Sequence, residues 1–252
     1  MGTVRSPAIR VYRRVSTRFD PLREMLERGD FHQVTPPDAL AEWEYRDDRG
    51  MRVLYFAGTL LIEAADGDGA AEEFDARHRC ALPSDREIPD GGAAPERVTL
   101  IAGSDESGKG ERDRPMVVAA VAVPRDAEAE AIARGVRDSK LCSAAEIAEL
   151  AAWIVRAFAC EMRAYAVRER DAALAAHGGN ESRLLAAMHA ECLRALRGRT
   201  EFGLARVDRF APNRPVAAAC GGAFIVDECV RGEKHVACAA ASIVARHATL
   251  HP

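Results

Sequence analysis

Two adjacent acids, Asp105 and Glu106, close an apolar run and begin the stretch of the sequence with the clearest chemical character. A lysine between two glycines follows at positions 108–110, and a second apolar run begins after Pro115. Carboxylates at the end of a buried strand are costly unless they are paired or bind a metal ion. The stretch therefore predicts a site for divalent cations beside a loop that contacts a phosphate.

A P-loop is an alternative interpretation, because residues 103–109 fit the pattern G-x-x-x-x-G-K after a predicted strand. Three features count against it. Gly110 stands where a P-loop has a Ser or Thr for magnesium, and the two acids would repel a bound phosphate. Pro115 then leads into a strand where a P-loop continues as a helix. We therefore expect no ATP binding.

Metal-dependent hydrolysis of a phosphodiester fits the acids better. Two divalent ions about 3.5–4 Å apart activate a water and relieve charge on the leaving oxygen, and hard oxygen ligands suit Mg²⁺ or Mn²⁺. Such a site needs several convergent carboxylates. Asp105, Glu106 and Asp208 are candidates because each closes a predicted strand. The alternative is that the first two are ordinary turn acids, and the glycines, the lysine and the second strand weigh against it.

The elements that would position these residues follow from hydrophobic periodicity. Strands are predicted in the two apolar runs of residues 97–123 and at 161–167, 204–210 and 224–230. Helices are predicted over 126–135, 144–158, 180–198 and 236–247. A mixture of strands and helices of this kind indicates a three-layer α/β domain.

The first 80 residues predict a smaller unit of helices and a strand meander. Asp20 and Pro21 begin a helix, strands lie between Trp43 and Ala64, and a helix covers residues 70–79. The Asp-Gly-Asp-Gly segment at 66–69 lacks the remaining ligands of a calcium loop and is interpreted as a turn. Three prolines and two glycines at 83–95 indicate a linker. The predicted domains are therefore 1–82 and 96–252, joined by this linker.

The bulk composition narrows the class of protein. A net charge of −4 argues against a generally basic coat, although nucleic acid needs only one positive face. Seven scattered cysteines without a CxxC pair, and no secretory signal, favour a reduced, cytoplasmic setting. No apolar run approaches the roughly 18 residues of a membrane span. We expect a cytoplasmic monomer that does not contact membranes.

Five motifs, in the same order, resemble those of the type 2 ribonucleases H, the ribonuclease HII and HIII family. They are Gly-Ser-Asp-Glu-Ser-Gly-Lys-Gly at 103–110 with the apolar run after it, Asp-Ser-Lys at 138–140, the helix from Asn180 with Leu-Leu-Ala-Ala-Met-His-Ala at 184–190, Val-Asp-Arg-Phe at 207–210, and the alanine-rich run at 239–246. The resemblance covers about residues 97–250. It implies a ribonuclease H-like three-layer α/β catalytic domain. The preceding α+β unit is similar to the TATA-binding-protein-like domain of ribonuclease HIII.

The resemblance implies an endoribonuclease that hydrolyses the RNA strand of RNA/DNA hybrids with Mg²⁺ or Mn²⁺, leaving 5′-phosphate and 3′-hydroxyl ends. In this family the N-terminal domain helps to bind the hybrid. The arginines of residues 1–28 are candidates for that contact, with a solvated basic face as the alternative. Specificity for a single embedded ribonucleotide, as in ribonuclease HII, and for a run of ribonucleotides, as in ribonuclease HIII, both stay open.

Carried over to this sequence, the resemblance assigns catalysis and metal binding to Asp105, Glu106, Asp208 and Glu233. The last assignment has rivals in Asp227 and Glu228, because Glu233 lies one residue closer to the alanine-rich run than the family pattern has it. Contacts with nucleic acid are assigned to Ser107, Gly108, Lys109, Gly110, Ser139 and Lys140. Glycines let the backbone approach the sugar and phosphate, where a 2′-hydroxyl can be recognised. We interpret His189 as structural.

Two departures from the family pattern bear on activity. Residues 111–114 are Glu-Arg-Asp-Arg where the family usually has Asp-Tyr-Phe-Gly. The sequence also stops at Pro252, before the helices that normally follow, which suggests a shortened product with exposed apolar surface. The alternative function is therefore a catalytically impaired protein that binds RNA/DNA hybrids.

Overall fold

The computed structural model describes residues 8–12, 20–35, 41–56, 59–78, 81–82, 96–213, 215–222 and 224–252. Its contacts divide the chain into two compact units, Met1–Val98 and Thr99–Pro252. The segment predicted as a linker, 83–95, lies outside the described residues.

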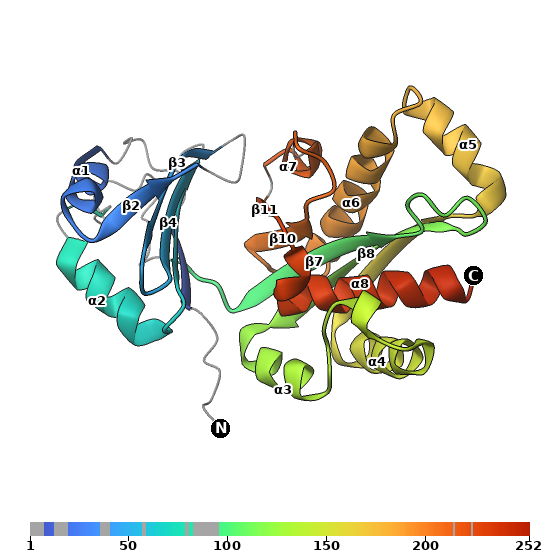
Figure 1. The fold of residues 1–252 in the computed structure, drawn as a ribbon, viewed down its shortest axis with the longest axis horizontal. Coiled ribbons are helices and arrows are strands. Elements are labelled where there is room, and N and C mark those ends of the chain that lie inside the picture. Colours follow the sequence, from blue (N-terminus) through green and yellow to red (C-terminus); the bar gives the residue numbers. More distant parts are fainter. Residues whose placement is uncertain are drawn as a thin grey trace. The chain divides into compact units, whose positions relative to one another are not determined.

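The first unit is an antiparallel sheet with two helices packed on one face (Figure 1). The strands lie in the order β2-β3-β4-β5-β1-β6. Their bounds are β1 Ala8–Tyr12, β2 Phe31–Val34, β3 Ala41–Asp47, β4 Met51–Phe56, β5 Thr59–Ala64 and β6 Glu96–Arg97, and the helices are α1 Asp20–Arg28 and α2 Asp68–His78. Alternate strand residues such as Trp43 and Val53 form one core with Leu26 of α1 and Phe74 of α2.

The periodicity of the sequence predicts α1, α2 and the strands between Trp43 and Ala64, and the structure contains them. It does not predict β2, because four residues carry too short an alternating pattern to be recognised. In the structure β2 is held by its register with β3, in which Phe31 pairs with Asp47.

The second unit is built on a sheet of five strands in the order β11-β10-β7-β8-β9. The bounds are β7 Leu100–Ser107, β8 Met116–Pro124, β9 Ala159–Tyr165, β10 Leu204–Asp208 and β11 Ile225–Cys229. Strands β7, β10 and β11 run parallel, whereas β8 is antiparallel to both of its neighbours. The carboxyl ends of the three parallel strands therefore lie at one edge of the sheet.

Helices cover both faces of this sheet and give it three layers (Figure 1). Helix α6 (Glu181–Arg197) forms a core with alternate β8 residues, among them Val118 and Ala120. Helix α8 (Val236–Leu250) packs against β7 and β8 from the other side, with α4 (Ala144–Ala157) against it. The remaining helices are α3 Glu128–Ala133, α5 Val167–Ala176 and α7 Pro215–Cys220, with 3-10 turns at Arg125–Ala127, Ser139–Leu141 and Gly232–Lys234.

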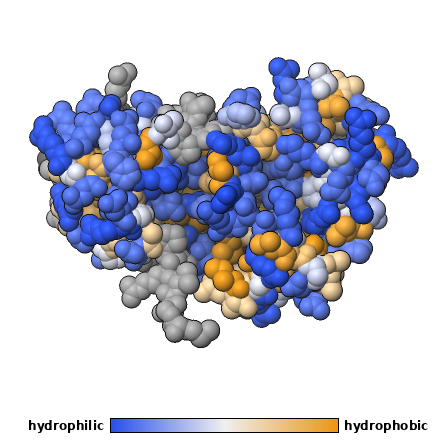
Figure 2. All heavy atoms as spheres, in the orientation of Figure 1, coloured by the Kyte–Doolittle hydropathy of each residue, from blue (hydrophilic) through white to orange (hydrophobic). Residues whose placement is uncertain are grey.

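The face of the molecule in Figure 2 is mainly hydrophilic. Exposed hydrophobic side chains include Ile132 of α3 and Val155 of α4. Of the helices in the described parts of the chain, none has the length and apolar character that crossing a membrane requires.

Gly103 lets β7 and α8 meet backbone to backbone. A Cβ atom placed on it would lie 2.0 Å from the carbonyl carbon of Ala237 and 2.2 Å from the nitrogen of Cys238. No real Cβ atom tolerates such distances to backbone, so any side chain at this position would push the helix off the sheet. The small residues along α8 serve the same close approach, because Ala237, Ala240 and Ala241 are all buried.

We expect Gly103→Ala to destabilise the second unit by on the order of 3 kcal/mol, because overpacking here cannot be relieved by a side-chain rotation. Urea unfolding of the full chain measures the change. Gly198→Ala is the matched control, since its added Cβ would meet only Ala195 O at 3.4 Å and Arg194 O at 3.8 Å. Equal free energies of unfolding for the two variants would contradict the close packing of β7 on α8.

Candidate active site

The parallel pairing of β7 with β10 brings the predicted acids together. Val207 pairs with Ser104 in the register of these strands, so Asp105 and Asp208 each come next, at the same edge of the sheet. Together with Glu106 they line one cavity of about 660 Å³. The other predicted site residues that line it are Ser107, Gly108, Lys109, Ser139 and Lys140.

Two predicted site residues do not line this cavity. Gly110 lines a neighbouring cavity of about 440 Å³, together with Arg112 and Arg170. Glu233, which is in the described part of the chain, is not among the residues that line either cavity. The structure thus places eight of the ten predicted residues around one space large enough for a ligand.

The carboxylates of this site repel one another because they lie close together where burial limits their contact with water. Burial, followed by the charges of Glu106 and Asp208, raises the pKa of Asp105 well above its ordinary value. Burial also raises the pKa of Asp208, with Glu106 and Glu233 adding to the rise and the Gly232 N–H and Lys140 opposing it. Such a cluster binds a proton or a cation readily, because either one relieves the repulsion.

A 3-10 turn fixed to Asp208 places Glu233 near the site. The backbone N–H of Gly232 donates to Asp208 Oδ1 at 2.7 Å. A Cβ on Gly232 would come within 2.7 Å of Asp208 Cα, so the glycine is needed for this contact. Glu233 follows it directly and is close enough for its charge to raise the pKa of Asp208.

The two rival acids of β11 have structural partners. Asp227 is buried, with Oδ2 3.9 Å from the Nε of the buried Arg206. Glu228 is fully buried and its Oε1 accepts hydrogen bonds from the N–H groups of Val216 and Ala217, at 2.9 and 3.0 Å, where α7 begins. These contacts also explain how two acids fit inside a strand.

The donor set fits a hard divalent cation in its chemistry, since it consists of carboxylate oxygens whose mutual repulsion a cation would relieve. Within the described residues, however, no three His, Cys, Asp or Glu side chains already surround one point as ligands. Asp105 Oδ1 accepts from Glu106 N at 2.8 Å, and Glu106 Oε1 lies 3.8 Å from Lys109 Nζ. Binding an ion would therefore require these side chains to turn towards it.

The loop between β7 and β8 is held in a defined conformation. Gly108 has φ +84°, and a Cβ there would lie 2.0 Å from the carbonyl oxygen of Pro115. The segment that follows is anchored, because Arg246 donates to Glu111 Oε1 at 2.8 Å and Arg170 donates to the backbone oxygens of Glu111 and, at 3.1 Å, Arg114. The charged sequence of residues 111–114 is thus compatible with an ordered loop.

Comparison with known proteins decides the family. The sequence model of ribonuclease HII matches residues 102–251, well over half of the chain. The chain belongs to the ribonuclease HII family. Members of this family are ribonuclease H hydrolases, so the predictions of family and enzyme class are confirmed. No curated protein sequence matches the chain significantly.

Solved structures confirm the predicted fold class. The crystal structure of Bst-RNase HIII in complex with Mn²⁺ is 21% identical with a TM-score of 0.52, covering 96% of this chain and 80% of that one. RNase H3 of Aquifex aeolicus is 18% identical with a TM-score of 0.50, covering 95% and 84%. Ribonuclease H2 of Pyrococcus horikoshii OT3, 21% identical with a TM-score of 0.52, covers 60% of this chain and 72% of its own. The ribonuclease HIII structures therefore match the fold of both units, and the TATA-binding-protein-like and ribonuclease H-like architecture is confirmed.

Sequence reasoning missed two residues at the site of this ribonuclease. Ser242 of α8 lines the same cavity as Asp105, close enough to oppose the rise in the pKa of Asp105, and its Oγ lies 2.6 Å from that of Ser139. The available signal was the one hydroxyl in the alanine-rich run of residues 239–246. His189 is also at the site, buried beside Glu106, although its position on an apolar helix face gave no sign of this.

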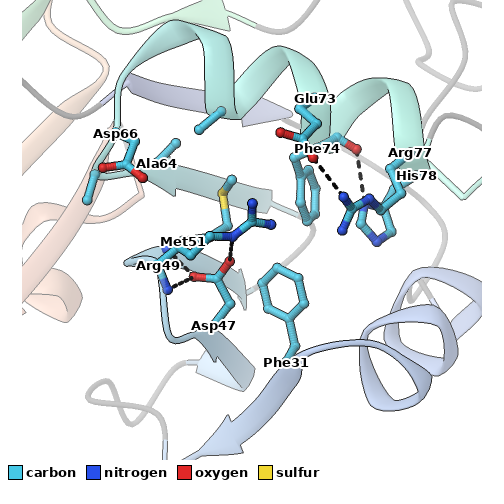
Figure 3. Close-up of a pocket in the computed structure, with 12 residues that line it drawn as sticks. Phe31, Asp47, Arg49, Met51, Ala64, Asp66, Glu73, Phe74, Arg77 and His78 are labelled. Atoms are coloured by element: carbon cyan, nitrogen blue, oxygen red, sulfur yellow. Dashed lines mark hydrogen bonds and ion pairs between the residues drawn. The ribbon is translucent and has the colours of Figure 1, made fainter.

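The N-terminal unit of the ribonuclease has a small hollow of its own between α2 and the sheet (Figure 3). Its volume is about 30 Å³, which is room for a few water molecules but not for a nucleotide. Asp47 in this hollow accepts hydrogen bonds from the backbone N–H groups of Arg49 and Met51. Among the described residues of this unit, the polar groups of the hollow thus act mainly on one another.

The raised pKa of Asp105 predicts a pH dependence of the metal-free ribonuclease. The folded chain binds the proton of the Asp105 carboxyl more tightly than the unfolded chain does, so protonation of Asp105 stabilises the fold. This stabilisation is complete below the ordinary pKa of 3.8 and is lost as the pH rises through the folded-state pKa. In EDTA at neutral pH we expect Asp105→Asn to raise the melting temperature above that of the wild type. The difference should shrink as the pH falls towards 3.8. A constant difference, or a lower melting temperature at neutral pH, would contradict the electrostatic explanation, and the exposed Asp126→Asn serves as control.

Proposed function

We propose that this ribonuclease H is an endonuclease that hydrolyses the RNA strand of RNA/DNA hybrids by two-metal-ion catalysis, leaving 5′-phosphate and 3′-hydroxyl ends. One observation carries the proposal. Three carboxylates from the ends of two parallel strands face the same cavity as the Lys109 loop and Lys140. Acids that can hold cations therefore stand beside cationic groups that can bind phosphates.

The acidic side chains are the proposed metal ligands: Asp105, Glu106 and Asp208, with Glu233 as the fourth. Divalent ions bound by them supply an activated water and neutralise charge on the leaving oxygen. Mg²⁺ and Mn²⁺ both suit these oxygen donors, and the Mn²⁺ in the similar Bst-RNase HIII structure supports a divalent ion here. Backbone N–H groups help to keep two of the acids in place, since that of Glu106 donates to Asp105 Oδ1 and that of Gly232 donates to Asp208 Oδ1.

The proposed nucleic-acid contacts are Ser107, Gly108, Lys109, Gly110, Ser139 and Lys140. The two lysines would bind phosphates as point charges. Gly108 and Gly110 both have positive φ, at +84° and +77°, so the loop presents backbone rather than side chain to the strand. A backbone that approaches this closely can contact a 2′-hydroxyl, which distinguishes RNA from DNA.

We further propose that residues 1–82 help to bind the hybrid, joined by a linker at 83–95 to a catalytic domain at 96–252. The fold of the first unit supports this role. The arginines of residues 1–28 support it less, because Arg10, Arg23 and Arg28, the three within the described residues, each pair with an acid of the same unit. A monomer in the cytoplasm is the proposed working state, and the free cysteines of the described residues agree with a reducing compartment.

Hybrid binding without cleavage was the alternative, and it rested in part on the charges of residues 111–114. Pairing of Glu111 with Arg246 and anchoring of the loop by Arg170 speak for an ordered and active loop instead. Cleavage of a labelled hybrid with Mg²⁺ and with Mn²⁺ separates the two functions. A substrate with one embedded ribonucleotide, compared with a continuous RNA strand, also separates HII-like from HIII-like specificity.

We expect Asp105→Asn to reduce hybrid cleavage by at least about 100-fold, because loss of a metal ligand should exceed the loss caused by residues that only support one. Binding of the hybrid should persist, since the lysines are unchanged. The same substitution at the exposed Asp126 is the control and should leave cleavage at the wild-type rate. Cleavage that survives Asp105→Asn with both metals would overturn the assignment of the site.

The identity of the fourth acid can be tested by one chemical change at two positions. We expect Glu233→Gln to slow cleavage by about 10- to 100-fold, as a group that supports metal binding does. Glu228→Gln keeps an oxygen that can accept the Val216 and Ala217 N–H groups, and should cut at nearly the wild-type rate. The opposite ranking of the two variants would assign the fourth acid to Glu228.

A further inference from the structure

Both ring nitrogens of His189 contact side chains of strand β7. It lies on α6, is fully buried, and places Nδ1 2.7 Å from Ser104 Oγ and Nε2 3.3 Å from Glu106 Oε2. His78 at the end of α2 and His177 just after α5 behave differently. Their Nδ1 atoms lie 2.9 and 2.8 Å from the backbone oxygens of the residues four positions earlier. A histidine that only fills the core needs no carboxylate partner.

Ser104 fixes the orientation of the His189 ring. Its hydroxyl donates to the carbonyl oxygen of Ala119 at 2.8 Å, because a carbonyl can only accept. The Ser104 oxygen is then left to accept from His189 Nδ1. With Nδ1 held in this way, Nε2 is directed at Glu106 Oε2, and a proton on either of these two atoms makes the contact a hydrogen bond. The three side chains form one chain of contacts between α6 and β7.

Phe210 holds the same ring from a third direction. The rings of His189 and Phe210 stack with centroids 5.2 Å apart and an angle of 13°. Lys109 Nζ lies 5.2 Å from the Phe210 centroid and donates to the Phe210 backbone oxygen at 3.3 Å. Phe210 follows Asp208 by two residues, so His189 contacts segments that carry two of the acids.

We propose that His189 is a positioning residue for the ribonuclease reaction, fixing Glu106 through Oε2 so that the carboxylate is presented to the cavity in one orientation. The inference rests on the proposed role of Glu106 as a metal ligand. Glu106 lies at the end of β7 with its side chain only 10% exposed, and Lys109 Nζ lies 3.8 Å from its other oxygen, so each carboxylate oxygen has its own neighbour. Groups that orient a ligand in this way strengthen metal binding without touching the metal.

Two amide substitutions distinguish the contact made by Nδ1 of His189 from the contact made by Nε2. The amide nitrogen of Gln can take the place of Nε2 and keep the contact with Glu106, whereas that of Asn can take the place of Nδ1 and keep only the contact with Ser104. We expect His189→Asn to weaken Mn²⁺ binding, measured by calorimetry without substrate, by about 10- to 100-fold and to lower kcat similarly. KM for the hybrid should stay unchanged, and His189→Gln should restore most of both properties.

Controls distinguish positioning from simple loss of packing. His177→Asn makes the same change at a histidine outside the site and should leave Mn²⁺ affinity and kcat as in the wild type. Melting in EDTA reports the stability of each variant without metal. Equal Mn²⁺ affinities for the wild type and His189→Asn would overturn the proposal, as would equal losses in the Asn and Gln variants. If the Asn variant does not fold, Ser104→Ala takes its place, with weaker Mn²⁺ binding expected and wild-type binding contradicting the proposal.

Glu106→Gln separates failure of this inference from failure of the proposed function. If Glu106→Gln binds Mn²⁺ as the wild type does, Glu106 is not a ligand and both assignments fall. If Glu106→Gln loses Mn²⁺ binding while His189→Asn keeps it, the metal site stands and only the positioning role is overturned. In the Glu106→Gln background, His189→Asn should cause no further loss of affinity, because the two residues act through one contact.

Discussion

The mutual repulsion of three carboxylates at one edge of a sheet is the constraint on which the second unit depends. Parallel pairing of β7 with β10 places Asp105 and Asp208 next to each other, and burial removes the water that would screen them. Glu106 adds a third charge to the same cavity wall. Such an arrangement costs free energy in the metal-free chain and is typical of sites that bind a cation or carry out a reaction.

Each of the three acids has a neighbour from a different part of the fold. Ser242 of α8 lies close enough to Asp105 to oppose the rise in its pKa, and Asp208 accepts a hydrogen bond from the N–H of Gly232 in the turn after β11. Glu106 has His189 from α6. Because these contacts come from both faces of the sheet and from its edge, the layers of the fold and the geometry of the site depend on one another. A shift of any one layer would change the direction of one carboxylate.

Close packing makes this precision possible. The backbone of α8 rests directly on Gly103, two residues before Asp105, so there is little freedom for the helix to move relative to the acids. The loop after β7 is fixed in a similar way, since Gly108 lies against the backbone of Pro115. Glu111 of this loop pairs with Arg246, and Arg170 donates to backbone oxygens of the loop, which adds contacts between the loop and two helices.

The sequence by itself was enough to predict the α/β class, two units, the family and the eight residues that line the cavity. These predictions were possible because motifs and hydrophobic periods are local patterns. It could not decide between Glu233 and its rivals, since Glu228 and Asp227 differ from Glu233 only in partners that the tertiary structure supplies. It also interpreted His189 as structural, because the position on α6 is apolar on both sides in sequence. The contact with Glu106 spans 83 residues, and only the packing of α6 on the sheet brings the two side chains together.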